Sequence, residues 1–140
     1  MYEHSLRPPL IVAGPGIAKN QRNATRVYLQ DIMPTTLELA QVAIPKQVEF
    51  RSLLPLLRGQ REQQYEAIYG AYRDDMQRMV LQDDHKLIYY PKIDKTMLFN
   101  LADDPHEMTN LADDPKWGQR RQQLTQALHQ LQHEMDDPLH

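Results

Sequence analysis

Apolar residues are spaced differently in the two parts of the chain: isolated runs come first, and short, evenly spaced runs follow. The first run, residues 10–13, reads Leu-Ile-Val-Ala and stops at the turn Gly14-Pro15-Gly16. Because it shows no polar alternation, it predicts a strand buried on both faces. Such a strand needs neighbours on both sides, and residues 1–9 contain no run that supplies them.

Two helical segments are predicted in the rest of the first part. Asp31 has the chemistry of an N-cap, and the apolar residues after it recur at helical spacing until Pro45. Pro34 is acceptable within the first turn, where backbone donors have no helical partners. Residues 52–59 predict a short apolar turn or helix closed by glycine. The polar run 60–64 then marks the predicted boundary of this part.

Past that boundary the chain predicts four short strands, at residues 65–72, 76–81, 86–90 and 97–101. They are rich in aromatic and branched residues, and Asp-Asp pairs or a Pro-containing segment separate them. Tight turns join antiparallel strands, whereas parallel strands need long crossovers. The pattern therefore predicts an antiparallel meander.

The tail begins with a repeat, Leu-Ala-Asp-Asp-Pro, at residues 101–105 and 111–115. In each copy the second aspartate suits an N-cap and the proline suits the first helical position, with Glu107 placed as a capping-box acid. The second copy predicts a longer helix with one apolar stripe, which should cover one face of the sheet. The stripe consists of Trp117, Leu124, Leu128, Leu131 and Met135.

Composition excludes several functional classes. The net charge of −3 gives no electrostatic case for nucleic acid, and no apolar run approaches the roughly 20 residues that span a bilayer. Cysteine is absent, so thiolate chemistry and disulfides are excluded. The chain does not start with a signal peptide, and the sequence leaves the compartment open between periplasm and cytoplasm.

Five segments, in order, cover nearly the whole chain. They are Tyr2-Glu-His-Ser-Leu-Arg-Pro-Pro-Leu-Ile-Val-Ala-Gly-Pro-Gly16, Asp31-Ile-Met-Pro-Thr-Thr-Leu-Glu-Leu-Ala40, Ser52-Leu-Leu-Pro-Leu-Leu-Arg-Gly59, Lys86-Leu-Ile88 and the stretch from Leu98 to Pro115. Together they resemble the region that follows the catalytic lysine in the type I, formylglycine-dependent sulfatases of the alkaline phosphatase superfamily. The resemblance implies that this chain is the C-terminal portion of such an enzyme, with Met1 an internal methionine.

The resemblance also implies the fold and its domains. Residues 1–60 are expected to be the end of the sulfatase α/β catalytic domain. Residues 61–140 are expected to form the C-terminal subdomain, which flanks the active-site cleft. The expected fold class is α+β, with the end of an α/β domain followed by a four-stranded antiparallel sheet packed against a C-terminal helix.

The resemblance further implies what the chain lacks. Sulfatases hydrolyse a sulfate ester with a formylglycine made from a Cys/Ser-x-Pro-x-Arg motif and with calcium or magnesium. Neither Ser5 nor Ser52 lies in that motif, and the family's sulfate-contacting lysine lies about four positions before Tyr2. No catalytic residue, metal ligand or cofactor is therefore expected in this chain, and the isolated chain is predicted to be inactive.

Two polar residues remain as candidates for substrate binding. His4 and Arg7 follow the position of the family's lysine, so His4 is expected to approach the substrate and Arg7 to pair with an acid. The alternative is that both residues only support the start of a strand. Five Asp-Asp pairs and the pair His129 and His133 resemble metal ligands, but aspartate is favoured at turns and both histidines lie away from the apolar stripe. They are interpreted as structural and exposed residues.

Two other functions stay open. One is a related hydrolase of phosphate or phosphonate esters, whose distinguishing nucleophile motif is absent from these residues. The other is a non-catalytic binding or assembly module that self-associates through the exposed strand edge at residues 10–12.

Overall fold

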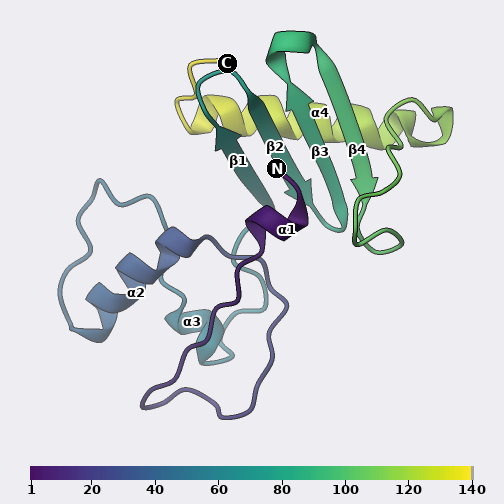
Figure 1. The fold of residues 1–140 in the computed structure, drawn as a ribbon. Coiled ribbons are helices and arrows are strands. Elements are labelled where there is room, and N and C mark those ends of the chain that lie inside the picture. Colours follow the sequence, from purple (N-terminus) through teal and green to yellow (C-terminus); the bar gives the residue numbers. More distant parts are fainter. Residues whose placement is uncertain (140) are drawn as a thin grey trace. The chain divides into compact units, whose positions relative to one another are not determined.

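The computed structural model describes residues 1–139, which form two compact units (Figure 1). The sheet unit consists of residues 1–9 and 67–139, and the helical unit consists of residues 10–66. The predicted division at residue 60 places residues 1–9 with the first part, whereas here they pack with the sheet. As a statement about the domains of a longer enzyme, the division into 1–60 and 61–140 stays a prediction.

The sheet unit contains the predicted meander. Strands β1 (Ala67–Tyr72), β2 (Gln77–Gln82), β3 (His85–Tyr90) and β4 (Lys95–Asn100) are antiparallel and lie side by side in chain order. In the centre of the sheet Val80 lies opposite Tyr69 on one side and Leu87 on the other. Asp83 has a positive φ of 51° in the turn between β2 and β3, a conformation that aspartate tolerates better than most residues.

Helix α4 (Gly118–Glu134) covers one face of this sheet, as the apolar stripe predicts (Figure 1). Leu124 and Leu128 are almost fully buried against Val80, Leu87 and Leu98. Before the helix, the side chain of Asp114 accepts a hydrogen bond from the backbone of Lys116 and so caps the turn η3 (Pro115–Trp117). The predicted α+β class, with a four-stranded antiparallel sheet and a C-terminal helix, is confirmed.

The opposite face of the sheet, called the second face below, carries its own apolar cluster of Met79, Leu81, Ile88 and Phe99. Met1 and Tyr2 pack on this cluster, and the short helix α1 (Glu3–Leu6) follows them. A Cβ atom on Gly70 would lie 3.2 Å from the Met1 sulfur and 2.9 Å from the Met79 methyl carbon. Glycine in β1 therefore allows Met1 to approach the sheet.

The helical unit contains η1 (Leu29–Asp31), α2 (Ile32–Leu39) and α3 (Leu54–Leu57), so both predicted helical segments are confirmed. The prediction of a buried strand at residues 10–13 is wrong. Ile11 is 91% exposed, and no described residue forms a strand ladder with this run. An apolar run does not stay a strand without neighbours to accept its backbone hydrogen bonds.

The first Leu-Ala-Asp-Asp-Pro copy does not start a helix, contrary to prediction. Its Asp104 side chain instead accepts a hydrogen bond from the backbone of Thr109, which closes a turn. A short 3₁₀ helix, η2 (Pro91–Ile93), lies between β3 and β4. Among residues 1–139 no helix combines the length and apolar character that crossing a membrane requires.

Candidate functional site

Helix α1 presents the two residues predicted to bind substrate. Its single turn is held by backbone bonds in which Ser5 donates to Tyr2 (2.9 Å) and Arg7 donates to Glu3 (3.0 Å). His4 and Arg7 are both exposed, and the His4 ring stacks on the Tyr2 ring with centroids 5.9 Å apart. Within the described chain no ion pair involves Arg7, so the expected acidic partner is not found.

A buried charge cluster lies between α1 and the second face. The Lys86 ammonium lies 2.6 Å from a carboxylate oxygen of Glu3 and 2.8 Å from one of Glu107. The Lys86 side chain is fully buried, that of Glu107 is 1% exposed and that of Glu3 is 21% exposed. A lysine is almost never fully buried unless it is paired, and this one has two partners of opposite charge.

The backbone joins the same cluster. The Glu3 amide donates a hydrogen bond of 2.6 Å to the second carboxylate oxygen of Glu107. The backbone nitrogen of Met1 donates to the Gln77 side chain. Residues 1–3 are therefore held by directional polar contacts as well as by apolar packing.

Glu107 has a different role from the one its spacing predicts. Its φ of +55° cannot continue a right-handed helix, so the capping-box assignment is wrong. Three residues later, the Asn110 side chain accepts hydrogen bonds from the backbones of Leu98 (2.9 Å) and Ala112 (3.1 Å). This loop is therefore fastened to the outer edge of β4 by Asn110, and it places the Glu107 carboxylate against Lys86.

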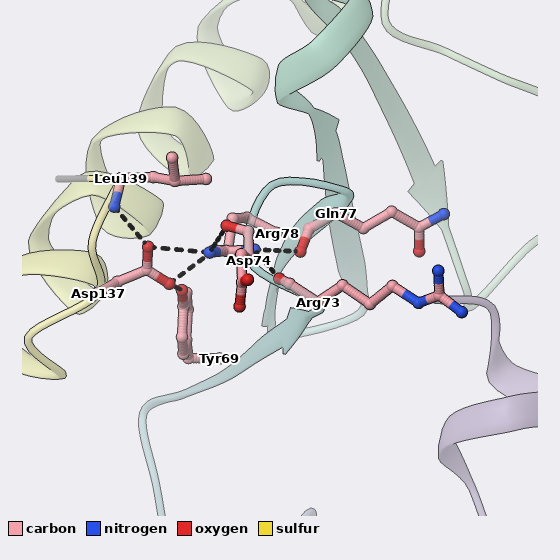
Figure 2. A network of polar contacts seen from close by, with 7 residues as sticks. All are labelled: Tyr69, Arg73, Asp74, Gln77, Arg78, Asp137 and Leu139. Atoms are coloured by element: carbon pink, nitrogen blue, oxygen red, sulfur yellow. Dashed lines mark hydrogen bonds and ion pairs between the residues drawn. The ribbon is translucent and has the colours of Figure 1, made fainter.

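A second buried ion pair lies on the α4 side of the sheet (Figure 2). The Arg78 guanidinium contacts both carboxylate oxygens of Asp137, at 2.5 and 3.1 Å, and the Tyr69 hydroxyl donates to the same carboxylate. The remaining guanidinium hydrogens go to the backbone carbonyls of Arg73, Asp74 and Gln77. All the guanidinium N–H groups of Arg78 have acceptors here, so the network attaches Asp137 to the sheet.

The helical unit is organised around one fully buried carboxylate, Asp31. It accepts hydrogen bonds from the backbones of Tyr28 (3.0 Å) and Arg51 (3.1 Å) and from the Tyr65 hydroxyl (2.5 Å). Burial first, and then this hydrogen bond, raises the pKa of Tyr65. Asp31 stands at the N-cap position of α2 as predicted, but its side chain makes no capping bond to that helix.

A polar hollow of about 330 Å³ opens beside this network. Its lining residues are Arg51, Arg61, Gln63, Gln64, Tyr65 and Glu66. Arg51 donates to the Gln64 carbonyl (2.8 Å), and the Gln64 amide donates back to the carbonyls of Arg51 and Ser52. These bonds hold the segment together from within and leave the hollow without an unpaired buried donor.

The other candidate metal ligands do not gather into a site. Within residues 1–139 no group of three or more His, Cys, Asp or Glu side chains is arranged to hold a metal ion. His129 and His133 are exposed on α4, and the Asp-Asp pairs at 74–75 and 83–84 occupy the hairpin turns. His85 contacts the Trp117 ring, with centroids 5.2 Å apart, and burial lowers its pKa.

Comparison with known families shows to which family the chain belongs. A family model described as N-sulphoglucosamine sulphohydrolase, C-terminal, matches residues 1–134. The chain belongs to this sulfatase family. It is therefore the C-terminal portion of a sulfatase, as the sequence predicts.

Two curated relatives support this sulfatase assignment. Arylsulfatase K of Gallus gallus is 35% identical over 125 residues, which cover 80% of this chain and 23% of that protein. The Delta 4,5-hexuronate-2-O-sulfatase of Bacteroides thetaiotaomicron is 29% identical over 126 residues, covering 83% of this chain and 26% of that enzyme. The chain thus spans about a quarter of the length of these two relatives.

Solved structures agree with the sulfatase fold. A 2-O GAG sulfatase matches with a TM-score of 0.73 and 26% identity, over 89% of this chain and 29% of that one. The phosphonate monoester hydrolase of Agrobacterium radiobacter matches with a TM-score of 0.60 and 21% identity, over 74% of this chain and 24% of that one. The second likeness concerns the fold alone.

The residues present do not fit the family's formylglycine. Sulfatases use a formylglycine and a divalent metal, yet the sequence contains no cysteine, and its two serines, Ser5 and Ser52, lie outside the formylglycine motif. The Ser52 hydroxyl accepts a hydrogen bond from the Leu54 backbone and so serves the start of α3.

Proposed function

We propose that this chain forms the substrate-side, C-terminal part of a sulfatase that hydrolyses sulfate esters of carbohydrates. The observation that carries the proposal is the family match over residues 1–134. Support for the substrate class comes from the names of two relatives, a hexuronate-2-O-sulfatase and a 2-O GAG sulfatase. The nucleophile and the metal ligands are assigned to residues of the enzyme outside this chain.

Within this part, His4 and Arg7 are proposed as the substrate-binding residues. Both are exposed on α1, and their backbone is held to the sheet by the neighbouring Glu3. An imidazole and a guanidinium offer N–H hydrogen-bond donors that suit the hydroxyl, carboxylate or sulfate groups of an acidic sugar. Their role is to bind and orient the sugar, because neither residue supplies the nucleophile.

Replacing His4 tests this proposal. In the enzyme expressed from the full reading frame, His4→Ala is expected to raise the KM for a sulfated sugar about tenfold, which corresponds to about 1.4 kcal/mol, while kcat stays within about twofold. The physical reason is that a binding contact is lost in the ground state and the transition state alike. Steady-state kinetics on wild type, His4→Ala and Arg7→Ala measure this.

Ser5→Ala provides the matched control, since Ser5 is an exposed residue of the same short helix. It is expected to leave both KM and kcat at the wild-type values. If His4→Ala and Arg7→Ala also leave both constants unchanged, the two residues serve only the start of the segment. If the full enzyme hydrolyses no sulfate ester, the proposed function itself is wrong.

The assembly-module alternative depends on the apolar run at residues 10–12. Leu10, Ile11 and Val12 are exposed at 43, 91 and 37%. Self-association through this run stays a prediction.

A further inference from the structure

The Glu3–Lys86–Glu107 cluster brings together residues that are far apart in the chain. Glu3 precedes α1's exposed residues, Lys86 is the second residue of β3, and Glu107 belongs to the loop after β4. Each comes from a different one of the five segments that carry the sulfatase resemblance. A single ion cluster thus connects three of those segments, and neither the fold of the meander nor the packing of α4 requires it.

Apolar packing alone leaves the position of α1 poorly defined. The Tyr2 ring lies 5.9 Å from the Phe99 ring at an angle of 60°, and its hydroxyl contacts the Met97 sulfur at 3.5 Å. Met1 lies against Gly70. Apart from the weak hydroxyl–sulfur hydrogen bond, these contacts are non-directional and favour burial in general rather than one register. A helix of four residues also has no stability of its own.

The charged cluster supplies directional contacts that fix the register of the segment containing α1. Glu3 is recognised twice, because its carboxylate pairs with Lys86 while its backbone amide donates to Glu107. Glu3 therefore contacts the Lys86 cation through its carboxylate and the Glu107 anion through its backbone amide. Shifting the segment by one position would put Tyr2 or His4 against Lys86 and leave the buried ammonium with one partner instead of two. A buried charge that loses a partner is costly, so the register is strongly selected.

We propose that Lys86 and Glu107 form a docking site for Glu3 that fixes α1 on the second face and thereby positions His4 and Arg7. The occupant of this surface is the chain's own segment, residues 1–9. Lys86 and Glu107 are positioning residues, since their side chains contact Glu3 rather than substrate. The docking itself stands on the contacts above, and only its effect on substrate binding rests on the proposed function.

Amide hydrogen exchange of the 140-residue chain, followed by NMR, tests the docking. In Lys86→Met the carboxylates of Glu3 and Glu107 face each other without the ammonium, so the amides of Glu3, Leu6 and Arg7 are expected to exchange at least about tenfold faster. Glu3→Gln keeps the size of the side chain and the backbone amide of residue 3 and removes only the charge. The exchange rates of the same amides are therefore expected to rise at least about threefold. Amides of α4 should keep their wild-type rates.

Two controls match these substitutions. Lys92→Met removes a lysine of the same unit that is 56% exposed and pairs with Asp75 at the surface. Glu38→Gln removes an exposed glutamate of α2. Both are expected to leave the exchange of residues 3–7 unchanged. If Lys86→Met also speeds exchange throughout α4, the sheet unit itself has opened. The exchange rates of residues 3–7 in Glu3→Gln then test the docking proposal. Wild-type exchange of residues 3–7 in Glu3→Gln overturns the docking proposal.

Kinetics of the full enzyme test the positioning role separately. Lys86→Met is expected to raise KM at least as much as His4→Ala does, because it displaces both His4 and Arg7, and the double variant should be no worse than Lys86→Met alone, because His4 no longer contacts substrate once α1 is displaced. A drop in kcat without a change in KM would contradict this. Because the exchange experiment uses no substrate, the docking and the substrate role of His4 can fail independently.

Discussion

Asp137→Asn is expected to lower the free energy of unfolding by about 3–5 kcal/mol, as is typical when one partner of a buried ion pair is removed. The Arg78 side chain is 2% exposed, and it would remain charged with no anion beside it. The Tyr69 hydroxyl would lose the carboxylate that accepts its hydrogen bond. Urea unfolding of the wild type and of Asp137→Asn, monitored by Trp117 fluorescence, measures the difference in the free energy of unfolding.

Asp136→Asn is the matched control for this change. Asp136 is exposed and has a positive φ of 50°, which asparagine tolerates well. Its effect is expected to stay within about 0.5 kcal/mol. Equal stabilities of Asp137→Asn and wild type would contradict the role given to the Arg78 network.

The same pair predicts a pH dependence. Burial alone raises the pKa of Asp137, but the hydrogen bonds from Arg78 and Tyr69 outweigh it, so the pKa lies below the ordinary value of 3.8. A carboxyl with a lowered folded-state pKa stabilises the fold above its ordinary pKa and loses that contribution as the pH falls through the lowered value. The gap between wild type and Asp137→Asn should therefore be constant above about pH 5 and shrink below about pH 4.

Leu124→Ala is expected to lower the free energy of unfolding by about 3 kcal/mol. Leu124 is fully buried between α4 and the sheet, where it packs with Val80 and Leu87. Truncation leaves a cavity that the strands cannot fill, because their hydrogen-bonded ladders fix the spacing of the sheet. Urea unfolding measures the loss, and Gln123→Ala, an exposed change on the same helix, should be close to neutral. A near-neutral Leu124→Ala would mean that α4 does not form the core.

The sequence predicts those parts of the fold in which local signals and tertiary structure agree. The four strands alternate with turn-forming aspartates, and the stripe around Leu124 and Leu128 identifies the buried side of α4. Asp114 caps its turn as expected because a Pro follows it directly. Each of these features depends on neighbours within a few residues, which a single sequence displays.

The features that the sequence does not predict depend on partners far along the chain. Leu10 to Ala13 has the composition of a buried strand, but its state depends on strands that the described residues do not supply. Glu107 has the spacing of a capping acid, yet Lys86, 21 positions earlier in the sequence, determines where its carboxylate lies. The available signal was Lys86 itself, a charged residue aligned with Ile88 and Tyr90 on one face of a strand.

The sequence does not predict the position of residues 1–9, for the same reason. The apolar second face of the sheet, with Met79, Ile88 and Phe99, needs a cover, and no local pattern indicates which segment provides it. Only the pairing of Glu3 with Lys86 indicates that residues 1–9 are this cover. For the candidate site, His4 and Arg7 are both exposed, the acidic partner expected for Arg7 is not found among the described residues, and the contact of either residue with a substrate stays a prediction.

The most direct test of the account is aryl sulfate hydrolysis, measured side by side for the purified 140-residue chain and for the product of the reading frame extended upstream of Met1. We predict no turnover by the chain. We predict turnover by the extended product, whose added residues should include a lysine just before Met1 and a Cys/Ser-x-Pro-x-Arg motif further upstream. Sulfate release by the 140-residue chain alone, or an extended product that lacks both features and activity, would contradict the account.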